Sequence, residues 1–483
     1  MKTYFTRKNL FLFTVLIGTS VLILIPFIRF FYFNSLLVGE ESYYHARITR
    51  QIIERGIPEK DELILGGRPY IINPYHILLS RIGYFLGVEF SSQLIPFLSG
   101  VISLIILYFI LVAIKIDDAR NFYILLILIL SPPFLGVFNY SNPGALAILF
   151  TMTGIYFFIK EDIFYFTMAV FFLTAATLFS FITPFITLAV LLSYSIYKKK
   201  MLKLYLLLAS ILIFFILIYS SILYWEYGLP NNFSLLQQNF FQRFLSDLGA
   251  NLGFSIFSII LFGLGVAFTW NYKRKLYPIY LTIFILFILT IFNDLPNIYL
   301  NFFISTFAGI GVHHLIKRKW TLYLIKELTI LAIFSGLLFS TTSYISRLAT
   351  TNPSRDVVDS LVWLSVNSKR NEVVLSHFAK GYWIEFLAER KVILDKDFSY
   401  IPNALQKLED TNKIFLNRNL RDTKKLLDLY NVTYIWIDKD MKEGLVWSKP
   451  NDGLLYLLSN NQTFRNIYSE NDISIWKYIG RPT

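Results

Sequence analysis

The sequence predicts a polytopic α-helical membrane protein with about 11 transmembrane helices and a C-terminal soluble α/β domain. The first observation is composition: of 483 residues, 55% are hydrophobic and 16% are charged, and the mean hydropathy is +0.53. A soluble protein of this composition would leave too much apolar surface in water. The second is a series of long apolar runs up to residue 343, and the third is a change of pattern after Pro353.

The first apolar run, 10–33, follows a basic start and is too long for the core of a signal peptide, so we interpret it as a retained membrane helix. The near-continuous stretch 161–197 is interrupted by Pro184, which favours two helices there. The other expected spans are 93–115, 121–138, 143–160, 163–180, 181–197, 203–225, 253–271, 276–292, 297–316 and 322–343.

Cationic residues gather in the connections on one side of the membrane, as in Lys198-Lys199-Lys200 and Lys317-Arg318-Lys319. Cytoplasmic loops of membrane proteins are enriched in Lys and Arg. We therefore expect a multi-pass protein of the cell membrane with a cytoplasmic N-terminus. Residues 34–92, 226–252 and 344–483 are expected outside the cytoplasm.

The same distribution of charge excludes some function classes. The net charge of +13 is divided among short loops and forms no continuous basic face, so we expect no nucleic-acid partner. The chain has no Cys, which excludes disulfides, thiolate metal sites and a Cys nucleophile. No expected span carries an ionisable pair near its middle, which weighs against an ion-coupled transporter.

The two predicted domains are a transmembrane domain, 1–343, and an extracytoplasmic α/β domain, 344–483. Alternating β-rich and helical runs indicate the second. We expect strands at 372–376, 391–394, 413–416, 432–438 and 473–478, and helices at 355–367, 400–409, 420–430 and 451–459. In the first external loop, a helix should run from Glu41 to Arg55 and an amphipathic segment, 76–88, should lie in the membrane interface.

The first external loop also holds the strongest candidates for catalytic, metal-binding or phosphate-binding residues. Glu41 and His45 are four residues apart and share a face of the expected helix, where a carboxylate and an imidazole can bind a divalent cation. Arg47 can hold a phosphate through charge-assisted hydrogen bonds. Glu40 and Glu41 could equally be a solvated helix start that complements the helix dipole, and the pattern leaves both readings open.

Three further candidates lie in external segments. His76 follows a Pro-bent stretch that contains Arg68, and a structural hydrogen-bonding role is slightly more common for such a His than a catalytic one. Asp247 is a lone carboxylate in the apolar loop 226–252, where a solvated role is the more frequent one.

Glu41-Ser42-Tyr43-Tyr44-His45-Ala46-Arg47 follows the first span directly. It resembles the acidic-x-Tyr-Tyr-His-x-Arg motif of oligosaccharyltransferase catalytic subunits and their archaeal relatives. These are GT-C-type glycosyltransferases, which use polyprenyl-phosphate-linked sugar donors. The resemblance continues in the segments Leu245–Gly249, Phe307–Gly311, Leu361–Leu364, Val373–His377, Gly381–Ile384, Arg390–Asp395 and Tyr430–Asp438.

The resemblance implies roles for two acids. Glu41 matches the first-loop acid that binds metal and helps to activate the acceptor, and Asp247 is the nearest match to a late-loop acid that engages acceptor or metal. The family's second acidic motif is missing, because Asn139-Tyr140-Ser141-Asn142 carries no carboxylate. Its Trp-Trp-Asp-Tyr-Gly motif, which reads an acceptor sequon, is replaced by residues 376–383.

The sequence therefore predicts a membrane glycosyltransferase that moves a sugar or oligosaccharide from a polyprenyl (dolichyl) phosphate donor to an acceptor protein or glycan at the outer membrane face. Its expected catalytic residues are Glu41 and Asp247, which would also hold a divalent metal, Mn²⁺ or Mg²⁺. The expected substrate-binding residues are His45, Arg47, Arg68, His76 and Arg243. Two alternatives stay open: an inactive relative that binds a lipid-linked glycan, and a lipid or glycan transporter. The transporter predicts half-repeats, which the sequence lacks.

Overall fold

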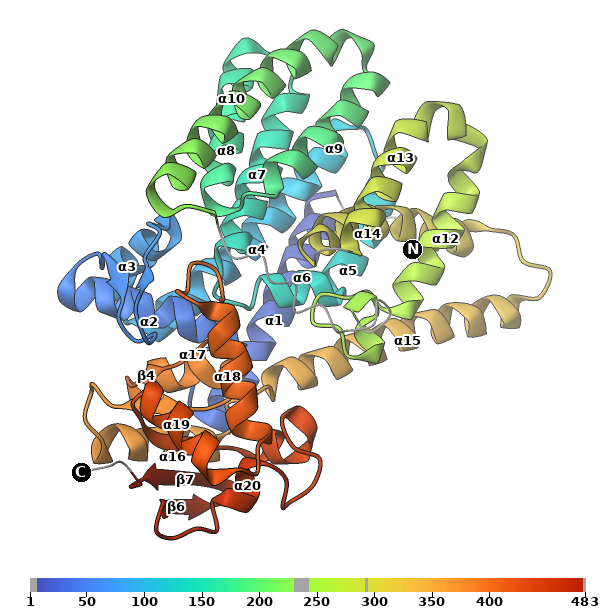
Figure 1. Cartoon of the computed structure of the whole chain (residues 1–483). Coiled ribbons are helices and arrows are strands. Elements are labelled where there is room, and N and C mark those ends of the chain that lie inside the picture. Colours follow the sequence, from blue (N-terminus) through green and yellow to red (C-terminus); the bar gives the residue numbers. More distant parts are fainter. Residues whose placement is uncertain (1–6, 230–242, 292–293, 481–483) are drawn as a thin grey trace.

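The computed structural model describes residues 7–229, 243–291 and 294–480. A bundle of long helices fills its upper part, and a mixed β-sheet with short helices lies below one end of that bundle (Figure 1). The first external loop and the C-terminal part, residues 350–480, meet at this end.

The bundle follows the apolar runs of the sequence. Six helical segments of the described chain are long and apolar enough to cross a membrane, and three shorter apolar helices lie among them. This supports a multi-pass membrane protein, while the count of about 11 spans stays a prediction. The bundle helices are α1 (Arg7–Phe33), α4 (Val88–Ala113), α5 (Asp118–Ile129), α6 (Pro132–Val137), α7 (Pro143–Ile159), α8 (Ile163–Phe179), α9 (Thr183–Tyr197), α10 (Leu202–Tyr227), α12 (Ile256–Thr269), α13 (Lys273–Thr290), α14 (Leu295–Lys317) and α15 (Tyr323–Ala349).

The expected span 121–138 is divided into α5 and α6. Ser131, which precedes Pro132, adopts an extended conformation with ψ of 133°. A residue before proline is driven away from the helical region, and proline itself offers no N–H, so the helix ends there. The chain consequently turns at the end of the bundle that faces the C-terminal part.

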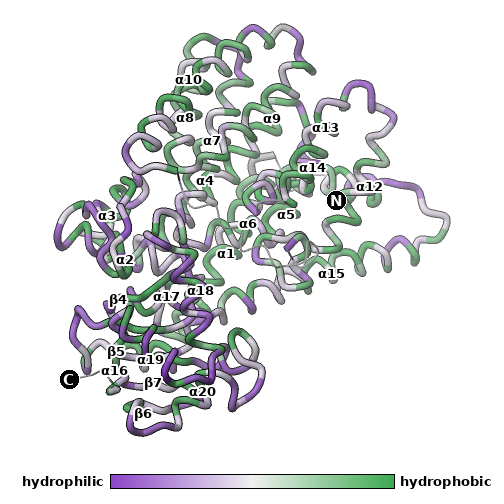
Figure 2. Tube along the Cα trace, viewed as in Figure 1, coloured by the Kyte–Doolittle hydropathy of each residue, from purple (hydrophilic) through white to green (hydrophobic). Residues whose placement is uncertain are grey.

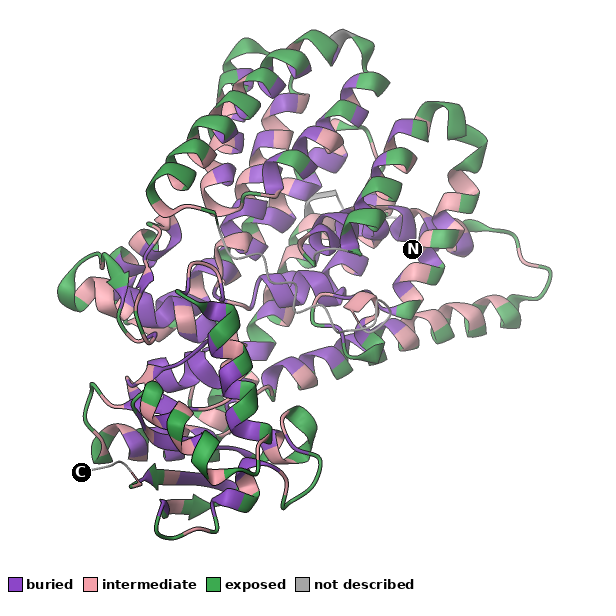
Figure 3. Ribbon diagram, viewed as in Figure 1, coloured by how far each residue is buried: buried purple, intermediate pink, exposed green. Residues whose placement is uncertain are grey.

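Apolar side chains cover the outside of the bundle. Figure 2 shows hydrophobic residues along the outer helices, and Figure 3 shows that many of the same positions are exposed. Trp225 is 91% exposed and Phe339 is 73% exposed. Such a surface is stable against lipid and unfavourable in water. The central helix, α14, is mostly buried. It packs so closely on α12 that a Cβ at Gly265 would lie only 1.9 Å from the Phe307 carbonyl oxygen, and the absence of a side chain at Gly265 permits this approach.

The first external loop contains α2 (Glu40–Arg55), β1 (Lys60–Asp61), β2 (Arg68–Pro69) and α3 (Pro74–Leu86). Gly39 precedes α2 with φ of 72°, and a Cβ there would lie 2.3 Å from the Tyr140 ring, so only glycine fits. Gly56 closes α2 with a hydrogen bond from its N–H to the Ile52 carbonyl. The helix expected at 41–55 and the amphipathic segment at 76–88 therefore correspond to α2 and α3.

The C-terminal part is built on a five-stranded sheet with the order β4-β3-β5-β7-β6. Its first three strands are parallel and its last three are antiparallel. The strands are β3 (Val373–Leu375), β4 (Lys391–Val392), β5 (Val432–Ile437), β6 (Phe464–Glu470) and β7 (Ile473–Tyr478), and the helices are α16 (Arg355–Asn367), α17 (Gly381–Trp383), α18 (Ala404–Leu416), α19 (Leu420–Leu429) and α20 (Leu454–Leu457).

The strand expected at 413–416 is wrong, because these residues form the last turn of α18. Ile414 and Phe415 are adjacent and both buried, against the α18–α19 corner and Trp447, which mimics a short buried strand in the sequence. Strand β6 was not expected. It lies at the edge of the sheet, and only its first residue, Phe464, is buried, so the segment carries little apolar signal in the sequence.

The first external loop extends the other edge of this sheet. The Val392 N–H donates to the Leu63 carbonyl at 2.8 Å, and the Leu65 N–H donates to the Val392 carbonyl at 2.9 Å. Ile64 between them is 1% exposed and belongs to the core of the C-terminal part. The loop and the C-terminal part thus share one hydrophobic core.

Candidate functional site

The start of α2 contacts both a connection of the bundle and the C-terminal part. The Ser141 N–H donates to the Ser42 hydroxyl at 2.9 Å, so the connection 138–142 is held against α2. Arg29, fully buried at the end of α1, donates to the carbonyls of Leu37 and Thr351, the second at 2.6 Å. Arg29 was not among the residues predicted from the sequence. A lone arginine inside an apolar run is nevertheless a signal, because burying its charge costs free energy unless it meets a specific partner.

Glu41 faces this junction with an exposed side chain. The surrounding protein is nevertheless dense enough that desolvation raises the pKa of its carboxyl, while Lys396 opposes the rise and Glu40 and Asp397 add to it. A carboxylate that solvent can reach and that holds a proton more tightly than usual is suited to accept a proton from an acceptor group.

Lys396 is the cation of this junction that contacts the first-loop acids, and it was not among the residues predicted from the sequence. Its Nζ lies 2.8 Å from an oxygen of Glu40. Burial alone would lower the pKa of Lys396, but the carboxylates of Glu40 and Glu41 have the larger combined effect. The pKa of Lys396 is therefore raised overall, and the ammonium stays charged. Lys396 is separated from Glu40 by 356 residues, so no local pattern joins them.

Asp247 caps the start of α12. One of its carboxylate oxygens accepts a hydrogen bond from the Ile256 N–H at 2.8 Å, and the other accepts from the Ser340 hydroxyl. Arg347 holds the same turn by donating to the carbonyls of Ser246 and Ala250 at 2.9 and 2.8 Å. Both oxygens of Asp247 are therefore engaged within the protein, and its expected catalytic and metal-binding roles stay predictions.

His45 and His76 form a buried pair. The His45 Nδ1 and the His76 Nε2 are 2.7 Å apart, and the Tyr70 hydroxyl lies 2.8 Å from the His76 Nδ1. Burial lowers the pKa of His45 to about 3 and lowers the pKa of His76 well below its usual value, so both rings are neutral at pH 7. The pair ties α2 to α3, and its expected role in substrate binding stays a prediction.

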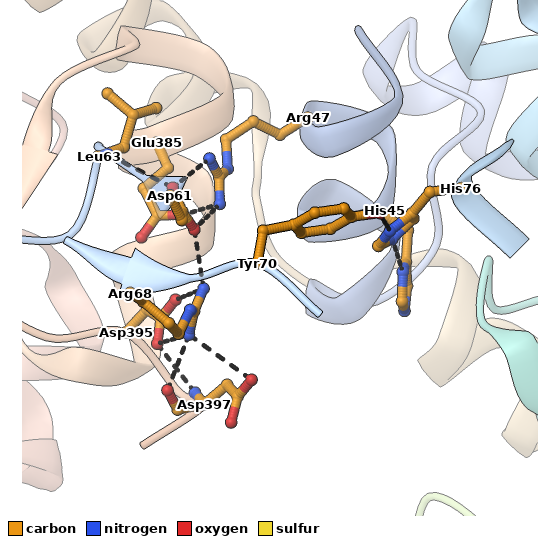
Figure 4. A network of polar contacts seen from close by, with 10 residues as sticks. All are labelled: His45, Arg47, Asp61, Leu63, Arg68, Tyr70, His76, Glu385, Asp395 and Asp397. Atoms are coloured by element: carbon orange, nitrogen blue, oxygen red, sulfur yellow. Dashed lines mark hydrogen bonds and ion pairs between the residues drawn. The ribbon is translucent and has the colours of Figure 1, made fainter. Parts of the chain in front are cut away.

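Arg47 and Arg68 belong to a buried ion network that joins the first loop to the C-terminal part (Figure 4). Arg47 contacts both oxygens of Asp61 at 2.8 and 2.5 Å, and it lies 3.1 Å from Glu385. Arg68 contacts Asp61 and Asp395, each at 2.9 Å. Both guanidinium groups therefore meet protein carboxylates in this conformation.

This network holds more carboxylates than guanidinium groups. Its two arginines face three buried carboxylates, so the charges do not cancel if all three are ionised. The pKa of Asp61, between the two guanidinium groups, is lowered despite its burial. Burial raises the pKa of Asp395 to about 6 and raises that of Glu385 well above its usual value. Burial thus favours the protonated form of Glu385, and a proton shared within the coupled carboxylates would reduce their excess of negative charge.

Arg243 lies apart from these groups. Its guanidinium lies 2.9 Å from a carboxylate oxygen of Asp294 and donates to the Ile291 carbonyl at 3.2 Å. Residues 230–242 of the expected external loop 226–252 lie outside the described residues. The expected contact of Arg243 with a donor head group stays a prediction.

Within the described residues, no group of three or more His, Cys, Asp or Glu side chains could hold a metal ion. Hard divalent cations such as Mg²⁺ take several oxygen ligands, and near Glu41 the connection 138–142 offers no carboxylate. The described residues around Glu41 therefore do not fit a protein-held metal centre, and a site shared between Glu41 and Asp247 stays a prediction.

No family model matches the chain, and no curated protein matches it. Solved structures do match it. The Archaeoglobus fulgidus oligosaccharyltransferase in complex with Zn and sulfate is similar with a TM-score of 0.67 and 14% identity, covering 97% of this chain and 73% of that one. Archaeal oligosaccharyltransferase AglB from Archaeoglobus fulgidus, in complex with an inhibitory peptide and a dolichol-phosphate, is similar with a TM-score of 0.65 and 13% identity. The match covers 98% of this chain and 74% of that one.

ArnT from Cupriavidus metallidurans, bound to undecaprenyl phosphate, gives a TM-score of 0.54 and 11% identity, covering 97% of this chain and 98% of that one. At such low identity the likeness concerns the fold. It confirms the resemblance that the first-loop motif indicated: the chain has the fold of GT-C-type membrane glycosyltransferases.

Proposed function

We propose that this protein is a membrane glycosyltransferase that takes a sugar from a polyprenyl-phosphate-linked donor and passes it to an acceptor at the outer membrane face. One observation carries the proposal. The exposed carboxylate of Glu41, with a raised pKa, stands beside the ammonium of Lys396 at the end of an apolar bundle. A lipid-linked phosphosugar places its phosphate at the membrane surface, so its transfer requires a cation for the phosphate and a base for the acceptor at the end of the bundle.

The reaction needs one proton transfer and one displacement. An acceptor hydroxyl or amide attacks the anomeric carbon of the sugar and forms the new glycosidic bond. The bond from that carbon to the phosphate oxygen breaks, and the polyprenyl phosphate or diphosphate leaves with the electron pair. Glu41 accepts the acceptor's proton and later releases it to water. The cationic groups of the site favour the charge that develops on the departing phosphate.

The neighbours in structure support the class of donor. They include an enzyme solved with undecaprenyl phosphate and another solved with a dolichol-phosphate. The acceptor is less constrained. At the place of the sequon-reading motif, Lys380 is buried and lies 2.8 Å from Asp438 and 2.6 Å from Asp440. We therefore propose a hydroxyl or amide acceptor, on a glycan or a protein, without assigning a sequon.

A second candidate is an inactive relative that binds a lipid-linked glycan. The absence of a carboxylate from the connection 138–142 favours it, since the family resemblance implies an acidic motif there. This candidate predicts donor binding without transfer.

The test is transfer from radiolabelled polyprenyl-phosphate and polyprenyl-diphosphate sugars by the purified full-length protein. Glu41→Gln keeps the shape of the side chain and removes its basicity, so the rate should fall by about 10²–10⁴-fold. Glu54→Gln, an exposed change on the same helix, is the matched control and should leave the rate unchanged. Equal activity of the wild type and Glu41→Gln would refute the role of Glu41. Donor binding with no transfer by the wild type would establish the inactive relative.

A further inference from the structure

The segment that follows β4 is fixed against the start of α2. The two neighbours of Lys396 are both held by Arg68, which contacts the Asp395 carboxylate at 2.9 Å and donates to the Asp397 carbonyl at 2.8 Å. Gly381 lies directly beneath, because a Cβ there would lie 2.8 Å from the Asp395 Cα. The backbone of Lys396 is therefore set by buried contacts on both sides.

The side chain of Lys396 reaches from this fixed backbone to the first-loop acids and stays open to solvent. It is 50% exposed, and its Nζ contacts Glu40 at 2.8 Å. An ammonium can donate three hydrogen bonds, and among the described residues Glu40 is its one hydrogen-bonded acceptor. The group thus keeps donors for a ligand that enters the junction beside Glu41.

The same ammonium works against a metal at this place. The resemblance implies that the first-loop acid binds a divalent cation, yet the described residues offer no three-ligand group, and Lys396 already supplies a positive charge to Glu40 and Glu41. A divalent cation between these carboxylates would be repelled by the ammonium and would lack ligands.

We propose that Lys396 is the cation that receives the phosphate of the lipid-linked donor, in the place that a divalent metal would otherwise occupy. This inference rests on the proposed function for the identity of the donor. Lysine binds phosphate as a point charge, and its position here lets it hold the phosphate oxygens while Glu41 faces the acceptor. A simple surface ion pair with Glu40 would contribute little to stability and nothing to phosphate binding.

The first test measures binding of undecaprenyl phosphate to the full-length protein in nanodiscs, in the presence of EDTA. Lys396→Gln should weaken binding by about 10- to 100-fold, because a hydrogen bond to a charged group is lost, and Lys396→Arg should restore most of it. Lys439→Gln is the matched control, since Lys439 is 59% exposed and lies 3.7 Å from Glu443. Wild-type affinity in Lys396→Gln, or loss of wild-type binding on adding EDTA, would overturn the proposal.

The second test needs no donor and no activity. Lys396→Asp removes the ammonium and places a further carboxylate beside Glu40, Glu41 and Asp397. Calorimetry should then detect Mn²⁺ binding in this variant and none in the wild type. Tight Mn²⁺ binding by the wild type would refute the inference. Failure of the protein to transfer sugar would refute the proposed reaction and leave both measurements interpretable.

Discussion

Replacing Arg68 by Met should loosen the contact between the first loop and the C-terminal part. The Arg68 side chain is 4% exposed and contacts Asp61 and Asp395, which are 2% and 0% exposed. Met retains most of the volume but leaves Asp395 without its cation. Breaking a buried ion pair in this way costs about 3–5 kcal/mol. Since 1.4 kcal/mol is tenfold in an equilibrium constant, opening of the segment 391–401 should become roughly 100- to 5,000-fold more populated.

Amide hydrogen exchange in detergent measures this opening directly. Exchange of 391–401 should accelerate in Arg68→Met, while that of the distant hairpin formed by β6 and β7 should not. Arg418→Met is the control, because Arg418 is 61% exposed and its pair with Asp452 at 3.2 Å is worth at most about 1 kcal/mol. Adding Asp395→Asn to Arg68→Met should recover part of the loss. Unchanged exchange of 391–401 in Arg68→Met would refute this account of the network.

Three further predictions concern Glu41, Asp247 and the orientation of the chain in the membrane. Because the pKa of Glu41 is raised, its carboxyl stays protonated, and unable to act as a base, at pH values above the usual pKa of 4.5. The acid limb of a pH–rate profile should therefore lie above pH 4.5. A limb at or below pH 4.5 would contradict the role of Glu41 as the base. Asp247→Ala removes the acceptor of the Ile256 N–H and should lower the free energy of unfolding by about 1.5–3 kcal/mol, measured by thermal unfolding, and Asp247→Asn should lower it by less. Loss of sugar transfer at unchanged stability would instead show a catalytic role. A protease added to right-side-out cells should remove residues 344–483 and spare the loop 198–203, and protection of the C-terminal part would reverse the predicted orientation.

The helical framework could be predicted because apolar runs of about 20 residues have one stable conformation in lipid. The division at Ser131 was missed although Pro132 and Pro133 signal it, since hydropathy alone does not register a helix break. The strand expected at 413–416 was wrong because Ile414 and Phe415 belong to a helix, α18, that packs against α19 and α20. A short run of buried apolar residues does not distinguish such a helix from a strand.

The candidate site was predictable only in its local half. The pattern of the first loop places Glu41, His45 and Arg47 on one helix, and α2 has that form. The partners that decide their chemistry come from far along the chain: Lys396 for Glu40, and Glu385 for Arg47. A phosphate-binding role for Arg47 and Arg68 was a reasonable expectation from residue type, but residue type does not reveal that buried carboxylates surround both groups.

The pairing of Leu63 and Leu65 with Val392 has a consequence for biosynthesis. When the first loop emerges from the ribosome, the strand that covers its edge is still more than 300 residues from being made, as the separation of 327 residues between Arg68 and Asp395 illustrates. Until translation passes β4, the backbone at 63–65 has no partner strand, and Arg68 lacks Asp395. The junction is therefore completed last, and a chain cut short within the bundle would carry Glu41 without Lys396.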